Sequence, residues 1–163
     1  MKDKAVVFFS RNGSTRIAAG IIAEKIDAEL IQLKARKARH GFVVSGFRAV
    51  TKKHLPPEGD PWGQIQECST VVLGAPIWGG NANPVMNGFL ARADLTGKKV
   101  YLFTVQADPE KAKSDEVLAH YSQRVEDAGG TVAGIFALTG ASPGKTADEG
   151  VLREALAGWE QLK

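Results

Sequence analysis

The chain has 163 residues, a length typical of one compact domain, and 44% of them are hydrophobic, which is enough to build a substantial core. It contains one cysteine, Cys68, so the composition excludes a disulfide framework and a metal site made of cysteines. Only five apolar residues (5–9) precede Ser10 and Arg11, too few for the core of a signal peptide or for a membrane span. We therefore expect one domain over residues 1–163, with no membrane span and a cytoplasmic location.

The net charge of +3 is concentrated in one segment of the chain. Residues 34–53 carry seven of the 21 Lys and Arg residues and no Asp or Glu, so the rest of the chain has 14 basic against 18 acidic residues, a net charge of −4. The sequence pI of about 9.0 therefore reflects one basic segment and does not indicate a nucleic-acid partner.

Short β-branched or aromatic runs alternate with longer stretches of helical apolar spacing along the chain. The pattern predicts strands at residues 5–9, 30–33, 70–75, 99–104 and 131–138, and helices at residues 14–26, 84–92, 110–127 and 148–161. The first run is continuously apolar, as expected for a central parallel strand that is buried on both faces. The alternation predicts an α/β domain whose parallel sheet is covered by helices on both faces.

The connection between the second and third predicted strands, residues 35–67, is too long for an ordinary loop. Apolar residues between 42 and 50 recur at helical spacing, which predicts a short helix that ends before Pro56, Pro57 and Pro61. The simpler interpretation is a crossover helix with solvated charges. The alternative is a docking surface for an acidic partner, an anionic membrane or a phosphate-bearing ligand.

Polar residues suited to phosphate binding follow the first predicted strand and directly precede the first predicted helix: Ser10, Arg11, Asn12, Gly13, Ser14 and Thr15. The hydroxyl and amide groups can donate hydrogen bonds, and the glycine permits a tight turn around an anion. The N–H groups and the positive dipole end of the helix attract a phosphate. The sequence therefore predicts a phosphate-binding loop. A plain helix cap is the simpler alternative.

Two loops of the chain resemble those of flavodoxins. In that family the first loop has the pattern Ser/Thr-x-Thr-Gly-x-Thr around the FMN phosphate. Ser10, Gly13 and Thr15 match it, and Asn12 replaces the middle threonine. Residues 74–81 resemble the family's Gly-x-Pro-x-Trp run, whose aromatic residue stacks on the isoalloxazine ring. The resemblance covers essentially the whole chain and implies a flavodoxin-like fold, a single doubly wound five-stranded parallel sheet of order 2-1-3-4-5 with helices on both faces.

The resemblance implies a noncovalent FMN site with the phosphate on residues 10–15 and the ring on the two following loops. The second loop would contribute Pro76, Ile77, Trp78 and Gly79, and the third, at the pyrimidine edge of the ring, Thr104, Val105, Gln106 and Ala107. The implied function is electron transfer between redox partner proteins, a reductase or a ferredoxin-like donor or acceptor. The basic segment 34–53 is a candidate surface for them.

Two other functions stay open. One is an FMN-dependent NAD(P)H oxidoreductase acting on quinones or similar acceptors, in which the basic segment meets the phosphates of the nicotinamide cofactor. The other is a flavodoxin-fold interaction module that has lost its flavin. The three histidines, His40, His54 and His120, have neither metal-ligand spacing nor a catalytic arrangement, so we expect no catalytic or metal-binding residue and place any chemistry in the cofactor.

Residues 140–146 end in Gly-Lys-Thr, as a Walker A loop does. Only three residues separate Gly140 from Gly144, where a Walker A loop has four, and Pro143 lacks an amide N–H. We interpret the segment as a loop between the fifth strand and the last helix. Its position at the same edge of the sheet could bring Lys145 near a bound ligand or partner.

Overall fold

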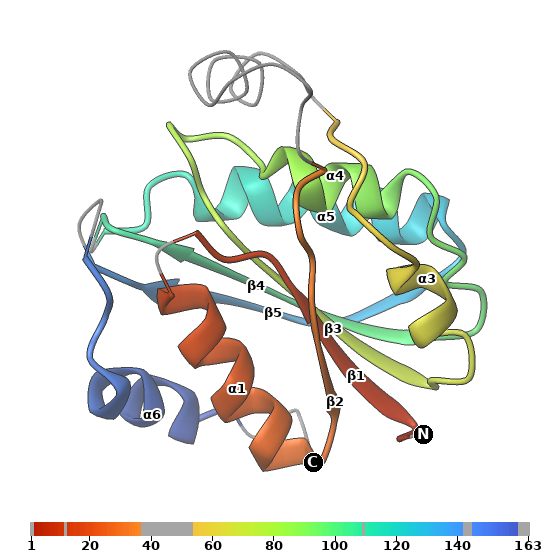
Figure 1. Cartoon of the computed structure of the whole chain (residues 1–163). Helices are drawn as coiled ribbons and strands as arrows, with labels where there is room; N and C mark the ends of the chain where they lie inside the picture. Colours follow the sequence, from red (N-terminus) through yellow and green to blue (C-terminus); the bar gives the residue numbers. More distant parts are fainter. Residues whose placement is uncertain (1, 12, 37–53, 109, 142–144, 160–163) are drawn as a thin grey trace.

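The computed structural model describes residues 2–11, 13–36, 54–108, 110–141 and 145–159 (Figure 1). Its centre is a five-stranded parallel sheet of order β2-β1-β3-β4-β5. The strands are β1 (Lys4–Phe8), β2 (Glu29–Gln32), β3 (Thr70–Pro76), β4 (Lys99–Gln106) and β5 (Thr131–Thr139). The helices are α1 (Ser14–Ile26), α3 (Pro61–Gln64), α4 (Pro84–Leu90), α5 (Ser114–Asp127) and α6 (Glu149–Ala157). The predicted sheet order and every predicted strand are confirmed, with ends shifted by two residues or fewer.

The helices cover both faces of the sheet, as the alternation predicts. Figure 1 shows α1 and α6 on one face and α3, α4 and α5 on the other. Alternate residues of β1 enter the two cores: Ala5 and Val7 pack under α4 and α5, whereas Val6 and Phe8 pack against α1 and α6. The continuous apolar run of β1 therefore follows from burial on both faces.

The contact between β3 and β4 leaves no room for a side chain at Gly74. A Cβ atom built there would lie 2.0 Å from the ring of Phe103, which fills the space instead. The register pairs Gly74 with Phe8 on one side and with Phe103 on the other. This packing fixes the register of β1, β3 and β4 relative to one another.

Three predicted helices end or begin differently from the sequence prediction. α4 ends at Leu90 and α6 at Ala157. The prediction that a helix starts at residue 110 is wrong, because α5 begins at Ser114. The Asp108 carboxylate accepts hydrogen bonds from the backbone N–H groups of Glu110 and Ala112, and Lys111 takes a left-handed φ of 54°. These contacts hold a turn that competes with helical geometry.

The two ends of the connection after β2 lie side by side. Ala35 and Pro57 form an isolated antiparallel bridge, and Glu58 N–H donates to Lys34 C=O. The helix predicted around residues 42–50 and most of the basic segment 34–53 lie outside the described residues. Pro61, predicted to stop a helix, is instead the first residue of α3, a position that proline favours.

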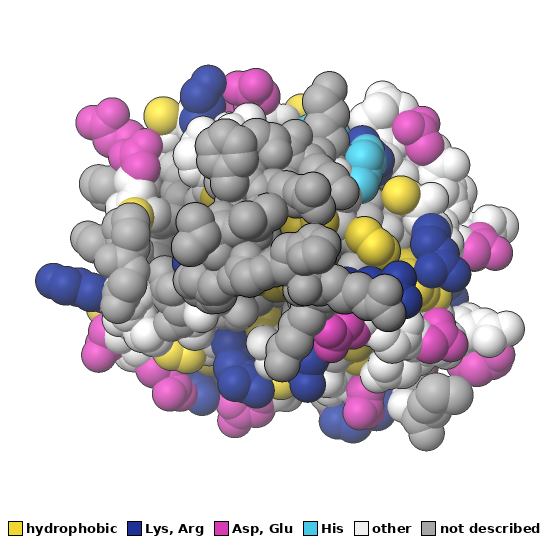
Figure 2. All heavy atoms as spheres, turned by 45° about the horizontal axis from the view of Figure 1, so that its top comes forward, with side chains coloured by type: hydrophobic (Ala, Val, Ile, Leu, Met, Phe, Trp, Pro, Cys, Tyr) yellow, Lys and Arg dark blue, Asp and Glu magenta, His cyan; other side chains and the backbone are white. Residues whose placement is uncertain are grey.

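Described basic and acidic side chains are interspersed on the face shown in Figure 2, rather than gathered by sign. No helix within the described residues is both long enough and apolar enough to cross a bilayer.

A polar chain joins the connection after β2 to helices α4 and α5. His120 Nε2 lies 3.0 Å from Asn87 Oδ1 and accepts a hydrogen bond from Arg124 Nε at 3.1 Å. The other end of the Arg124 guanidinium lies 3.3 Å from His54 Nε2. Partial desolvation of this largely exposed imidazole lowers the pKa of His120 below its ordinary value of 6.5, and the neighbouring Arg124 and His54 lower it further.

The lowered pKa of His120 makes the stability of the fold depend on pH. Because the unfolded chain binds a proton more readily than the native His120, the contribution is complete above pH 6.5 and is lost as the pH falls below that value. We expect the free energy of unfolding in urea to decrease between pH 7.5 and pH 5.5 and His120→Gln to flatten that dependence. An unchanged slope in this variant would assign the effect to other groups.

Candidate functional site

A cavity of about 380 Å³ opens at the carboxyl edge of the sheet. Four loops line it, those that follow β1, β3, β4 and β5. Ten of the fourteen residues predicted from the sequence meet there: Ser10, Arg11, Ser14, Thr15, Pro76, Ile77, Trp78, Val105, Gln106 and Ala107. The edge of an open parallel sheet where the strand order reverses is the usual ligand site of this architecture.

Four predicted residues do not line the cavity. Gly13 and Gly79 shape the loops beside it, with φ values of 97° and 55° that favour glycine. Thr104 is fully buried within β4, and its hydroxyl has no hydrogen-bond partner in the part of the chain that the structure describes. Asn12 lies outside the described residues. The cavity therefore uses the first two loops largely as predicted and only part of the third.

The loop after β1 leads into a helix whose first turn has no side-chain cap. Ser10 Oγ accepts a hydrogen bond from Gly13 N–H at 3.0 Å, which closes the loop. α1 then begins at Ser14 with Gly13 in the left-handed region, and within the described residues no side chain caps its first turn. Thr15 is 2% exposed, and its hydroxyl has no partner among the described residues. These donors fit an anion.

The loop after β3 holds the indole of Trp78 in a fixed orientation. Trp78 and Asn81 form a two-bond antiparallel bridge, at 3.2 and 2.9 Å, around Gly79 and Gly80. One edge of the indole packs on Phe9, with ring centroids 5.4 Å apart and an angle of 80° between the rings. The indole therefore forms a rigid aromatic wall of the cavity.

The polar groups at the end of β4 are used mostly in hydrogen bonds to the neighbouring loops. Val105 C=O accepts from Ile77 N–H at 3.1 Å, and Gln106 C=O accepts from Gly140 N–H at 2.7 Å. The Gln106 side-chain amide is oriented so that its oxygen faces hydrogen-bond donors. This oxygen accepts from the backbone N–H groups of Lys111 and Ala112, each at 3.2 Å. Nothing within the described residues hydrogen-bonds to the backbone N–H or C=O of Ala107, which is exposed.

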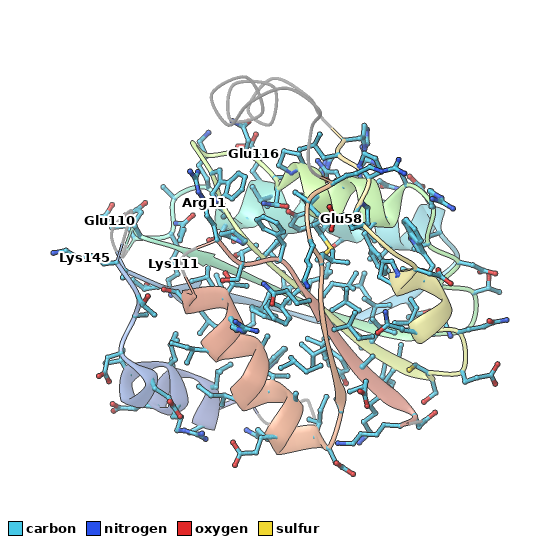
Figure 3. The ribbon with its side chains drawn as sticks, in the orientation of Figure 1. Arg11, Glu58, Glu110, Lys111, Glu116 and Lys145 are labelled. Atoms are coloured by element: carbon cyan, nitrogen blue, oxygen red, sulfur yellow. The ribbon has the colours of Figure 1, made fainter. Side chains whose placement is uncertain are left out.

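The charged side chains of the cavity lining are all positive. They are Arg11 and Lys145, and no Asp or Glu is among the lining residues of the described chain. In Figure 3, Arg11 lies between the loops after β1 and β3, whereas Lys145 projects outward from the edge of the molecule. The lining therefore favours an anionic ligand over a cationic one.

The segment after β5 was missed as part of the site, apart from the possible position of Lys145 near a ligand. Gly140 and Ala141 also line the cavity. Ala147 N–H donates to Ser14 Oγ at 2.9 Å, so this segment packs directly on the start of α1. The sequence carries no motif for such a contact, since small residues after a strand are common in any loop.

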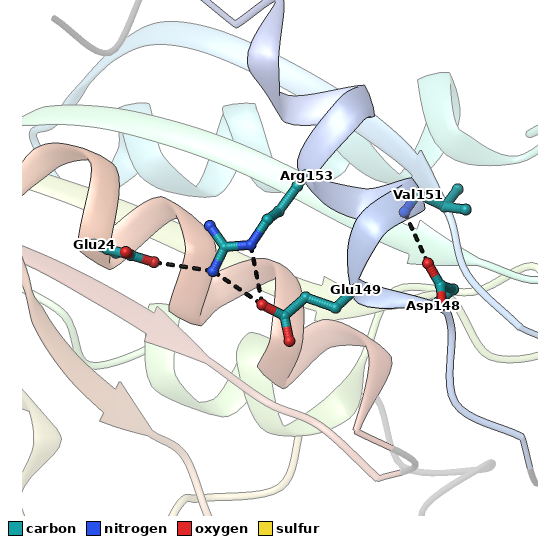
Figure 4. Close-up of polar contacts among 5 residues, drawn as sticks. All are labelled: Glu24, Asp148, Glu149, Val151 and Arg153. Atoms are coloured by element: carbon teal, nitrogen blue, oxygen red, sulfur yellow. Dashed lines mark hydrogen bonds and ion pairs between the residues drawn. The ribbon is translucent and has the colours of Figure 1, made fainter.

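Helix α6 is tied to α1 below this contact (Figure 4). Arg153 bonds both Glu24 of α1, at 3.1 Å, and Glu149, at 2.9 Å. The Asp148 carboxylate caps α6 by accepting from Val151 N–H at 3.1 Å. The ion pairs are exposed and contribute little individually. Together they fix the orientation of α6 relative to α1.

The sequence matches no protein-family model and no curated protein. The fold does match solved structures. Trp repressor binding protein from Bacillus subtilis is 19% identical, with a TM-score of 0.70 and 98% of each chain covered. The chain has the flavodoxin-like fold.

Two further solved structures connect this fold to flavins. A flavoprotein in complex with FMN from Lactobacillus acidophilus NCFM is 16% identical, with a TM-score of 0.56, over 84% of this chain and 93% of that one. Oxidised flavodoxin 1 from Bacillus cereus is 17% identical, with a TM-score of 0.54, over 98% of this chain and 95% of that one. The flavodoxin-like sheet order implied by the sequence is thus confirmed.

The backbone at Gly13 makes a testable contribution to the site. Gly13→Ala meets only ordinary contacts, at 3.5 Å from Thr146, but it forces an alanine to a φ of 97°. We expect a loss of about 1–2 kcal/mol in the free energy of unfolding, measured in urea. Gly20→Ala is the matched control, because Gly20 lies inside α1 with no atom within 4 Å of the added Cβ. It should stabilise the protein by about 0.5–1 kcal/mol. Equal effects of the two substitutions would contradict the assigned backbone role.

Proposed function

We propose that this protein binds FMN noncovalently in the cavity and transfers electrons through it between partner proteins. The observation that carries the proposal is the pairing, within one cavity, of the uncapped first turn of α1 with the fixed indole of Trp78. A phosphate fits the first and a flat aromatic ring fits the second. The solved FMN complex of a flavoprotein with this fold supports the choice of ligand.

The residues present fit FMN in charge and in size. The N–H groups of the α1 first turn and the Thr15 hydroxyl can donate to the phosphate oxygens. No carboxylate of the described lining opposes a dianion. The cavity volume of about 380 Å³ lies within the range of small-molecule sites, about 300–1,000 Å³.

Each wall of the cavity has a distinct task in this proposal. Ser10 and Gly13 shape the phosphate loop, and Thr15 donates a hydrogen bond to the phosphate. Trp78 stacks on the ring. Ala107, whose backbone N–H and C=O have no hydrogen-bond partner within the described residues, contacts the polar edge of the ring, the role that the sequence suggested for residues 104–107 as a group. When bound, FMN supplies the redox chemistry.

We propose an electron carrier rather than a self-sufficient oxidoreductase because the described lining holds no acid or base. The titratable side chains there are the two cations, Arg11 and Lys145. Proton transfer to a substrate would need a group that accepts and releases protons near neutral pH. The partners would be a reductase or a ferredoxin-like protein in the cytoplasm, and the basic segment 34–53 would be their docking surface.

FMN binding is tested by absorbance and fluorescence titration of the purified protein. We expect a 1:1 complex in the wild type. Thr15→Ala should weaken it about tenfold or more, because a hydrogen bond to a charged group is worth about 1.5–3 kcal/mol. Trp78→Ala should weaken it by a similar factor through lost stacking. Thr96→Ala, on an exposed loop away from the cavity, is the control. Wild-type protein that binds no FMN at micromolar concentration would leave the interaction module as the better interpretation.

Electron transfer through a partner is distinguished from direct use of a nicotinamide cofactor by the source of electrons. We expect the FMN-loaded protein alone to show no steady oxidation of NADH or NADPH with a quinone acceptor. Addition of a flavodoxin reductase should reduce the bound flavin, followed by absorbance. Sustained NADPH oxidation by the protein alone would favour the FMN-dependent NAD(P)H oxidoreductase, with Arg11 and Lys145 as candidate contacts for its phosphates.

A further inference from the structure

Arg11 is held over the aromatic wall of the cavity by a single contact. Its guanidinium carbon lies 5.8 Å from the centroid of the Trp78 ring, within the range of a cation–π interaction. The side chain is exposed and has no ion-pair partner or side-chain hydrogen bond within the described residues. An exposed cation–π contact is worth only about 0.5–1 kcal/mol, so Arg11 can leave the indole at small cost.

Trp78 cannot move away as easily. Its backbone is fixed by the bridge to Asn81, and its edge packs on Phe9 of the loop after β1. A ring that stacks on Trp78 must therefore displace or share the position of Arg11. Because Arg11 belongs to the phosphate loop, its Cα stays beside the bound ligand in either arrangement. The guanidinium then covers the ring or borders it.

The other charges around the cavity are committed or directed elsewhere. Lys145 projects outward (Figure 3). The Asp108 carboxylate accepts from two backbone N–H groups of its own turn, and Glu116 pairs with Lys113 at 3.2 Å. Arg11 is therefore the charged side chain of the described lining best placed to respond to a change of charge on a ring that lies against Trp78.

We propose that Arg11 makes the site selective for the reduced form of the flavin and so raises its reduction potential. This inference rests on the proposed FMN site. Two electrons and one proton, from a partner protein or from dithionite and solvent in the experiment, leave one net negative charge on the reduced ring. The donor is oxidised by two electrons. The Arg11 guanidinium attracts that charge and gains nothing comparable from the neutral oxidised ring.

The test compares the midpoint potential of bound FMN in Arg11→Gln, Arg11→Lys and wild-type protein, by dye equilibration at pH 8. Loss of the charge in Arg11→Gln should reduce the preference for the reduced form about tenfold, after allowance for solvent screening. A tenfold change corresponds to a decrease of about 30 mV for two electrons. Arg11→Lys should retain most of the wild-type potential, since it retains the charge.

Arg92→Gln is the matched control. Arg92 also lies over an indole, 4.1 Å from the Trp62 ring centroid, but on the α3–α4 side of the molecule and outside the cavity lining. We expect it to leave the potential unchanged. An Arg11→Gln potential equal to that of the wild type, or equal weakening of oxidised and reduced FMN binding, would overturn the role of Arg11. Absence of FMN binding by the wild type would instead overturn the proposed function itself.

Discussion

The site depends on the register that Gly74 and Phe103 impose on the three central strands. The Phe103 ring occupies the space of a side chain at Gly74, and the same register pairs Gly74 with Phe8. Two residues further along each strand, the chain reaches Ser10, Pro76 and Val105, and all three line the cavity. Packing in the interior of the sheet therefore brings three loops that are far apart in the sequence to the same cavity. A shift of one residue in any strand would also exchange the buried faces, which the apolar cores on both sides prevent.

The start of α1 is the second element that this register positions. The backbone leaves β1 at the top of the sheet and needs the left-handed conformation of Gly13 to turn into the helix. The Ser10 hydroxyl is used to close that turn, and Ser14 Oγ accepts from Ala147 N–H. The first loop thus divides its hydroxyl groups between structure and function. Among the described residues, the buried Thr15 hydroxyl is the one left for a ligand, whereas a sequence of several hydroxyl residues suggests that all of them bind.

Periodicity and apolar runs were enough to predict the five strands, most clearly β1, β3 and β4, because strands buried on both faces have little sequence freedom. Contacts that depend on one polar side chain were not predictable. The Asp108 carboxylate delays the start of α5, and Asp60 caps the short α3 that begins at Pro61. The third loop shows the same limit at the site. Its carbonyl groups at Val105 and Gln106 accept from Ile77 and Gly140, a pairing that depends on tertiary packing, and within the described residues nothing hydrogen-bonds to the backbone of Ala107.

The net charge of the chain and the charge at the cavity have different origins, although both are positive. The whole excess of Lys and Arg comes from residues 34–53, whereas the described lining owes its charge to Arg11 and Lys145 and to the absence of carboxylates. The rest of the lining consists of backbone groups, hydroxyls, an amide and apolar side chains on short, braced loops. Such groups are preorganised, and they stay uncharged when the charge of a bound ligand changes. The uncharged groups of the lining therefore hold a ligand in place through a redox change. The charge of the exposed Arg11 is what would favour one redox state of that ligand over the other.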